Sequence, residues 1–423
     1  MPQSPDSNAS ADSFGVEPGS GVGFLPLITL FVLVQVHRVV QLVLLWPPLS
    51  QQIDLNSHAQ IMQLLPRDLW RQEFHAAILY LQQAPPLPNL IYGAVVNLVE
   101  PPRQIAATLI LLNGFLSAVT AVLMALLFAR LGLGRWIGIG LAAVFIFSAD
   151  LLLIEYHTWG HFFYEISTML LCVLAAHAAL GIARRPGAWA ALLLGLWVAL
   201  LALTRATYSY FFIPALLWLL LAPGTRRPSV LAAFLLPVII LHGGWSLKNY
   251  VVHGYWSLTT SSWGGSNAYT GDGMRHGSQA RFRQWAGEMP DLCPQPWQDM
   301  LQQLPPYIFF IKIFDPAEKL PVPQRVIEHD EHIERERGQR VVLDTLALRD
   351  LSYCLQGAYM RYWLQDPLSV IASSWRSYQL FWLPVRQFNV MHSNPIQPVM
   401  PVFEPQPHPG QSLRAAWALS LIH

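Results

Sequence analysis

Asp54 stands just after the first long apolar run of the chain, in the polar stretch 51–58. A carboxylate in that position can take a proton from an acceptor group, so Asp54 is a candidate catalytic base. It is also suited to cap the N-terminus of a following helix, a position that Asp favours. The sequence leaves both interpretations open.

A second group of polar residues lies at positions 150–165, between two apolar runs. It contains Asp150, His157, His161 and Glu165, which are types that bind metals or transfer protons. Their spacing matches no metal-ligand pattern, so we expect no metal here. Glu165 also has a structural interpretation, because a carboxylate at the start of a helix is stabilised by the helix dipole.

Three basic residues occupy comparable places beside apolar runs, namely Arg103, Arg205 and Lys248. A guanidinium binds phosphate through two parallel hydrogen bonds, which makes Arg205 a candidate ligand for a lipid phosphate. The alternative is an interfacial Arg whose charged end reaches water. The sequence around it, Leu203-Thr204-Arg205, fits both interpretations.

The elements that must position these residues are membrane helices. Of the 423 residues, 53% are hydrophobic and 12% are charged, whereas soluble domains carry about 25% charged residues. The formal net charge of +1 gives no electrostatic reason to expect a nucleic-acid partner. We therefore expect an all-α polytopic membrane protein.

About eight apolar runs approach the roughly 20 residues that a transmembrane helix needs. The eighth is the weakest because Arg376 interrupts it. The predicted spans are 23–46, 105–131, 134–155, 163–183, 188–204, 207–222, 229–248 and 368–384.

Basic residues in the short connections predict the orientation. Alternate turns carry pairs of arginines, and positive charge marks the cytoplasmic side. The N-terminus is then cytoplasmic, and residues 1–22, which are small and polar, form a disordered tail without signal-peptide features. The arginines in question are Arg130 with Arg135, Arg184 with Arg185, and Arg226 with Arg227.

Two long segments then lie outside the membrane, 47–102 and 249–367. The periodicity of 57–83 predicts amphipathic helices in the outer interface, followed by a proline-rich break and a short apolar piece at 89–99. Residues 325–365 predict a charged helix, and Cys293 and Cys354 are either disulfide-bonded or free. Beyond the eighth span, 385–423 is expected to contain an outer loop and an incomplete terminal helix.

The segment that follows the seventh span resembles bacterial membrane glycosyltransferases of the GT-C class, related to the dolichyl-phosphate-mannose protein mannosyltransferases and the aminoarabinose transferases. Those chains carry Arg-Asn-Tyr, a Ser/Thr pair and Gly-x-Asn-x-Tyr-x-Gly in this order. Pro85-Pro86-Leu87 and Leu203-Thr204-Arg205 also resemble family motifs, and the resemblance covers roughly 24–384. The corresponding residues are Lys248-Asn249-Tyr250, in which lysine replaces the family's usual arginine, Thr259-Thr260 and Gly265-Ser266-Asn267-Ala268-Tyr269-Thr270-Gly271.

The resemblance implies a transferase that takes a sugar from a polyprenyl-phosphate donor, without a cofactor, in the bacterial inner membrane. Asp54 stands in the place of the family's acidic catalytic residue. Arg205, Lys248 and Arg103 would hold the donor phosphate. Asp150, His157, His161, Glu165, Asn267 and Tyr269 are further site candidates. The acceptor, which is a protein, a lipid or a glycan, is not specified.

Two other functions fit the same composition. A transporter or flippase for a lipid-linked or anionic substrate would also place charged groups at helix ends, and it requires matching polar groups on the cytoplasmic half. An inactive GT-C scaffold is the second alternative, because Leu55 follows Asp54 where the family usually has Asp-Glu. Transfer of a labelled lipid-linked sugar distinguishes these possibilities.

Overall fold

The computed structural model describes part of the 423-residue chain, and the helices below lie in that part. The described residues contain α-helices, a short 3-10 turn and a π-helical segment, and no strand among them. Residues 1–22 and 373–423, which include the predicted tail and terminal helix, are not among the described residues. The described residues are 23–52, 70–71, 74–81, 86–100, 102–148, 151, 165–254, 256–257, 287–288, 290, 293, 298, 346–368 and 371–372.

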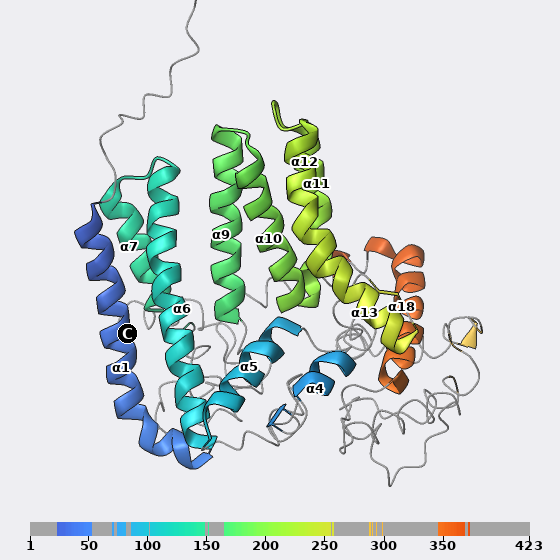
Figure 1. The fold of residues 1–423 in the computed structure, drawn as a ribbon, viewed down its shortest axis with the longest axis horizontal. Coiled ribbons are helices and arrows are strands. Elements are labelled where there is room, and N and C mark those ends of the chain that lie inside the picture. Colours follow the sequence, from blue (N-terminus) through green and yellow to red (C-terminus); the bar gives the residue numbers. More distant parts are fainter. Residues whose placement is uncertain are drawn as a thin grey trace, which may run out of the picture.

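Apolar helices dominate the described chain (Figure 1). Four stretches are long and apolar enough to cross a membrane: Phe24–Val43, Gln104–Arg130, Glu165–Arg184 and Pro228–His253. Shorter apolar helices lie between them, so the chain is a multi-pass membrane protein. The helices are α1 (Phe24–Gln52), α6 (Pro102–Arg130), α7 (Arg135–Ile146), α9 (Glu165–Arg184), α10 (Ala188–Thr204), α11 (Phe212–Leu221) and α12 (Pro228–Pro237).

The predicted spans agree with these helices in several places and differ in others. The spans at 105–131, 163–183 and 188–204 coincide closely with α6, α9 and α10. The span predicted at 134–155 was too long as one helix, because α7 ends at Ile146. The span at 207–222 begins as the 3-10 turn η2 (Ala206–Tyr208) before α11. Most of the eighth predicted span lies outside the described residues.

Helix α6 packs against α1, α7 and α9, and α10 packs against α9 and α12. Small side chains make the first of these groups compact, since Ala118, Ala121 and Ala125 of α6 and Ala142 of α7 are buried together. In a membrane, where lipid is as apolar as the side chains, close contact of small residues is the main source of helix association.

The closest approach of two helices occurs at Gly195 of α10. A Cβ atom there would lie 2.0 Å from the carbonyl oxygen of Phe234 in α12. Such a distance is far inside van der Waals contact, so only glycine allows the two backbones to meet this closely. The α10–α12 pair therefore depends on one residue type at one position.

The last long stretch bends in its middle. Helix α12 ends at Pro237, the π-helical segment η3 (Val238–Gly243) follows, and α13 (Gly244–His253) continues the chain. Proline and π-helical turns both interrupt the regular hydrogen-bond ladder and bend helices. As a result, α13 diverges from the direction of α12 (Figure 1). Lys248 thus lies within α13, whereas the predicted seventh span ended at residue 248.

The segment between α1 and α6 contains two short helices, α4 (Phe74–Tyr80) and α5 (Pro86–Leu98), which lie below α9 and α10 in Figure 1. Prolines occupy the first turn of α5, where their missing N–H groups leave no hydrogen bond unmade. Trp70 packs flat on Gly93, and the Arg71 Nη2 donates to the carbonyl oxygens of Val99 and Glu100 at 2.8 Å. This arginine caps the C-terminal end of α5.

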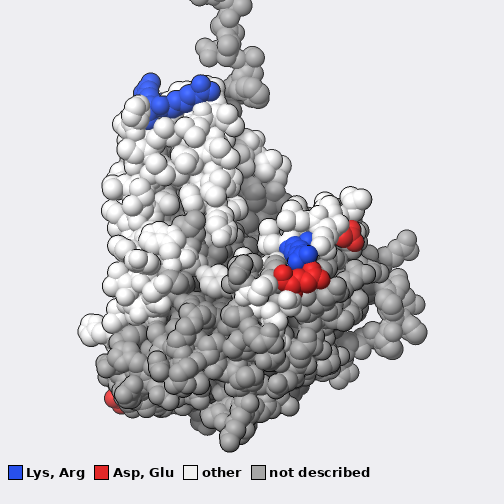
Figure 2. Space-filling view, turned by 90° about the vertical axis from the view of Figure 1, so that its right-hand side faces the viewer, with Lys and Arg blue, Asp and Glu red and all other residues white. Residues whose placement is uncertain are grey.

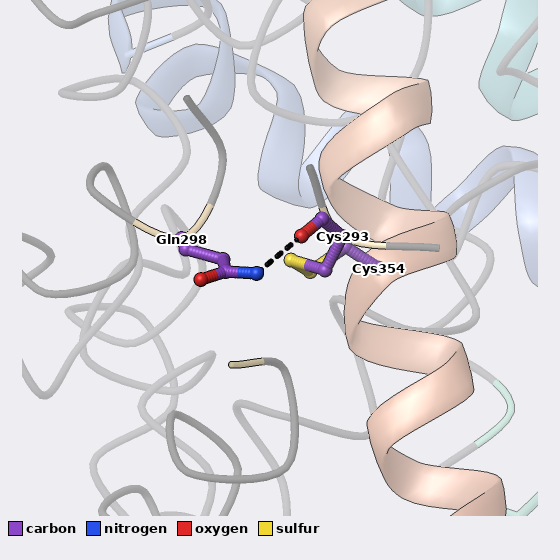
Figure 3. Close-up of a disulfide and its surroundings, with 3 residues drawn as sticks. All are labelled: Cys293, Gln298 and Cys354. Carbon is purple, nitrogen blue, oxygen red and sulfur yellow. Dashed lines mark hydrogen bonds between the residues drawn. A yellow bond between two sulfur atoms is a disulfide. The ribbon is translucent and has the colours of Figure 1, made fainter. Parts of the chain in front are cut away.

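A further helix lies near the end of the segment that follows α13. This is α18 (Leu346–Gln365), which stops before Asp366-Pro367 as predicted. A disulfide joins Cys354 of α18 to Cys293, and Arg361 of α18 pairs with Glu288 at 2.7 Å. Figure 3 shows the disulfide with Gln298, whose amide donates to the Cys293 carbonyl oxygen at 2.7 Å. The sequence left open whether these two cysteines are bonded or free, and in the structure they form a disulfide.

The two ends of the bundle differ in charge. The connections α6–α7, α9–α10 and α11–α12 all lie at one end (Figure 1), and α1 begins there as well. Arginines flank or occupy these three turns, and in Figure 2 Lys and Arg atoms gather at that end above an uncharged surface. A Cβ on Gly23, before α1, would lie 3.3 Å from the Arg135 guanidinium. The alternation of basic turns therefore corresponds to one common face.

We predict that Gly195→Ala destabilises the detergent-solubilised protein by about 1–3 kcal/mol, because the added methyl group meets a backbone carbonyl that cannot move independently. The matched control is Gly140→Ala in α7, where a Cβ meets no atom within 4 Å. Thermal unfolding of both variants measures the difference. An equal loss of stability in the two proteins would contradict the close α10–α12 contact.

We also predict that the denatured, unreduced protein has one reactive thiol, Cys172, among its three cysteines. Reaction with a polyethylene-glycol maleimide should shift its electrophoretic mobility by one step before reduction and three steps after it. Three steps without reductant would show that Cys293 and Cys354 are not joined. Cys293→Ser with Cys354→Ser should remove the reductant dependence.

Candidate functional site

The clearest polar contact among the predicted site residues joins α9 to the end of α10. Arg205 Nη1 donates to Glu165 Oε1 in a salt bridge between residues 40 positions apart. Glu165 is the first residue of α9, and Arg205 follows the last residue of α10 with an extended backbone. A carboxylate at a helix N-terminus and a cation at a C-terminus are both favoured by the helix dipoles.

This ion pair lies at the end of α9 and α10 opposite to the α9–α10 connection, and therefore away from the arginine-rich turns (Figure 1). The Arg205 side chain is 36% exposed and that of Glu165 24% exposed. Among the described residues, Nη1 is the only guanidinium nitrogen of Arg205 with a hydrogen-bond acceptor. Glu165 thus orients Arg205 while leaving its other donors for a further anion.

The turn that follows Arg205 is held by local contacts. The Tyr208 N–H of η2 donates to the carbonyl oxygen of Arg205 at 3.0 Å. The Tyr208 ring stacks edge-on against Phe211, with ring centroids 5.4 Å apart.

Lys248 occupies a different position, on α13. Its Nζ lies 3.7 Å from the centre of the Trp245 ring and donates to the carbonyl oxygen of Leu81, which follows α4. The contact is a cation–π interaction combined with a charged hydrogen bond. It ties α13 to the end of α4, and no contact between the described residues joins Lys248 to the Glu165–Arg205 pair.

The structure therefore tests only part of the predicted site. It brings Glu165 and Arg205 together, which the sequence did not predict as a pair. Arg103 lies in the first turn of α6, but its side chain is outside the described part of the chain. Six other candidates also lie outside it: Asp54, Asp150, His157, His161, Asn267 and Tyr269.

Sequence reasoning overlooked a buried cation in the first span. Arg38 is 3% exposed, donates to the carbonyl oxygen of Ile146 at 2.5 Å and to His37 Nδ1 at 2.8 Å, and lies over the Phe147 ring. An ionisable residue at membrane depth is a functional candidate by default. Here its guanidinium caps the C-terminus of α7, so the contacts explain it structurally. An arginine inside an apolar run was the signal that could have revealed it.

A polar contact also lies in the arginine-rich half of the bundle. Arg130 Nη1 donates to His177 Nδ1 at 2.9 Å, and His177 Nε2 donates to the carbonyl oxygen of Leu123 at 2.8 Å. Both ring nitrogens of His177 are thus occupied in joining α9 to α6. These hydrogen bonds hold the two helices against each other.

The fold and these contacts define a multi-pass α-helical membrane protein with polar groups at the helix ends away from the arginine-rich turns. No protein-family model matches the chain, and searches of curated proteins and of solved structures also gave no significant match. The chemistry of the site must therefore be argued from its own residues.

We predict that Glu165 and Arg205 are energetically coupled. In a double-mutant cycle with Glu165→Gln and Arg205→Gln, the coupling free energy should be roughly 0.5–3 kcal/mol, because each single variant leaves the partner's charge without its counter-charge. Thermal unfolding of the four proteins in detergent measures it. Arg226→Gln is the control cation: it lies in the α11–α12 turn and should combine additively with Glu165→Gln.

Proposed function

We propose that this protein transfers a sugar from a polyprenyl-phosphate donor to an acceptor at the extracytoplasmic face of the membrane. The observation that carries the proposal is Arg205, a guanidinium at an outer helix end that Glu165 orients and whose remaining donors are available. Such a group fits a phosphate attached to a lipid, since the lipid chain can lie among the apolar helices.

The orientation follows from the charge asymmetry of the bundle. The arginine-rich turns correspond to the cytoplasmic side by the positive-inside rule, which puts the N-terminus in the cytoplasm. The Glu165–Arg205 pair, α4, α5 and α18 then lie toward the outside. A disulfide between Cys293 and Cys354 supports this assignment, because disulfides persist in oxidising compartments and are rare in the cytosol.

The proposed architecture is a GT-C-like bundle of about eight transmembrane helices with interfacial helices in the first outer loop. The residue motifs described above support it, and the short helices α4 and α5 are consistent with such a loop. The eighth span, at 368–384, is part of the proposal.

The reaction we propose is an inverting displacement at the anomeric carbon of the donor sugar. The bond between that carbon and the phosphate oxygen breaks, and its electron pair leaves with the phosphate. The acceptor hydroxyl or amine bonds to the anomeric carbon while its proton passes to Asp54 as general base. Arg205, Lys248 and Arg103 neutralise the charge that develops on the phosphate.

A transporter or flippase is the second candidate function, and His177 is the observation that bears on it. Alternating access needs polar groups on the cytoplasmic half, and His177 with Arg130 lies in that half. Both His177 nitrogens bind protein groups, however, and join two helices rigidly. Between the two functions, a transferase that binds a lipid phosphate accounts better than a transporter for the accessible hydrogen-bond donors of Arg205.

We predict that Asp54→Asn abolishes transfer of a labelled sugar from a polyprenyl-phosphate donor, because the amide cannot accept the acceptor's proton. Membranes that contain the wild-type protein should produce a labelled glycolipid or glycoprotein, which thin-layer chromatography and gel electrophoresis detect. Expression and membrane insertion of the variant should be unchanged.

The matched control is Glu288→Gln, which alters another carboxylate of the outer segment whose partner is Arg361. It should retain transfer. Full transfer by Asp54→Asn would remove Asp54 from the mechanism. Absence of transfer in the wild-type protein, together with movement of the lipid-linked sugar across the bilayer, would favour the flippase.

A further inference from the structure

Helix α13 is amphipathic in the opposite sense to a soluble helix. Its polar residues Ser246, Asn249 and His253 are buried, and they recur at intervals of three and four, which places them on one face. Its apolar residues Leu247 and Val251 are 52% and 73% exposed. A membrane helix with this pattern turns its polar face toward the protein interior, where substrates of polar chemistry bind.

Two residues on α13 have buried polar atoms without a hydrogen-bond partner. The Asn249 side chain is fully buried, and among the described residues neither its Nδ2 nor its Oδ1 has a partner. One turn earlier, the indole Nε1 of Trp245 is also buried and unpartnered. The spacing of four residues places Asn249 and Trp245 next to each other on the helix surface.

Two other polar side chains of α13 do have hydrogen-bond partners. The Ser246 hydroxyl between them in sequence donates to the carbonyl oxygen of His242 at 3.2 Å, and Lys248 donates to that of Leu81. Burial of an amide without partners is destabilising, and a leucine of similar size would avoid that loss. A polar ligand group that completes the hydrogen bonds gives a physical reason for asparagine at this position.

The course of the helix supports a functional role for α13. Pro237 and the π-helical segment η3 direct it away from α12, and π-helical insertions occur frequently at functional sites. The bend brings the helix against α4 and the cluster around Trp70 and Tyr92, to which Trp245 is packed.

The hydrogen-bonding groups of Asn249 and Trp245 fit a ligand that carries hydroxyl groups. An asparagine amide offers two donors and an acceptor, and an indole offers one donor. A sugar hydroxyl both donates and accepts, so it can satisfy both sides of the Asn249 amide. The ammonium of Lys248, one residue before Asn249, provides positive charge for a phosphate attached to the same sugar.

We propose that Trp245 and Asn249 form the subsite that binds the sugar of the lipid-linked donor, while the neighbouring Lys248 binds the phosphate of the same donor. This inference rests on the proposed transferase function. It assigns recognition of the sugar hydroxyls to α13, a role separate from phosphate binding by Arg205.

Binding measurements with paired lipids test the subsite. The full-length protein in nanodiscs is titrated with a bare polyprenyl phosphate and with polyprenyl-phosphate glucose and mannose of the same chain length. Wild-type protein should bind at least one sugar-bearing lipid more tightly than the bare lipid. Asn249→Leu should weaken binding of that sugar lipid about tenfold, the effect of one or two hydrogen bonds, and leave binding of the bare lipid unchanged.

Trp245→Phe provides a second variant, because it removes the indole N–H and keeps an aromatic ring beneath Lys248. It should also reduce binding of the sugar lipid alone. The control is Asn97→Leu in α5, whose amide donates to the carbonyl oxygens of Trp70 and Gly93 at 3.1 and 2.8 Å. Asn97→Leu should lower the melting temperature without altering the preference for the sugar lipid, whereas Asn249→Leu should maintain or raise the melting temperature.

Each result supports or overturns the assignment. Equal binding of the bare and the sugar-bearing lipids by the wild-type protein overturns it, as does an unchanged preference in both Asn249→Leu and Trp245→Phe. In those cases a protein that still transfers labelled sugar retains the proposed function without this subsite. Failure of the wild-type protein to bind any of these lipids or to transfer sugar overturns the transferase proposal as well.

Discussion

The structure depends on one constraint: polar groups at membrane depth need partners from the protein or from a bound ligand, because lipid provides none. Arg38 satisfies it by donating to the last carbonyl of α7, and His177 by joining Arg130 to a carbonyl of α6. The Glu165–Arg205 pair does the same where α9 begins and α10 ends. In each case a polar side chain bridges two helices, so the constraint also determines which helices are held together.

Close packing of small residues also holds the helices together, in addition to these few polar contacts. Alanines fill the contacts of α6 with its neighbours, and Gly195 lets α10 approach the backbone of α12 at Phe234. The same stretch of chain then bends at Pro237 and η3. The two halves of this stretch of 26 residues therefore differ in their contacts. Helix α12 packs within the bundle, and α13 lies against α4 and the cluster around Trp70 and Tyr92.

The chemistry that we propose follows from this division. Arg205, oriented by Glu165, and Lys248, held by Leu81 and Trp245, are cations on different helices. A lipid phosphate is the ligand that makes use of apolar helices and such cations together. The buried amide of Asn249 and the indole of Trp245 add neutral hydrogen-bonding groups beside Lys248, which a sugar requires and a bare phosphate does not.

The sequence by itself determined the membrane class, the positions of most apolar helices and the alternation of basic turns, because hydrophobicity, helix length and loop charge are local properties. It also identified Glu165, Arg205 and Lys248 as unusual. Only the tertiary structure decided that Glu165 pairs with Arg205, 40 residues away, that Cys293 bonds to Cys354, that Arg38 caps α7, and that α13 buries its polar face. These outcomes depend on which helices touch and how far one bends, and contacts between distant residues leave no periodic signal in the chain.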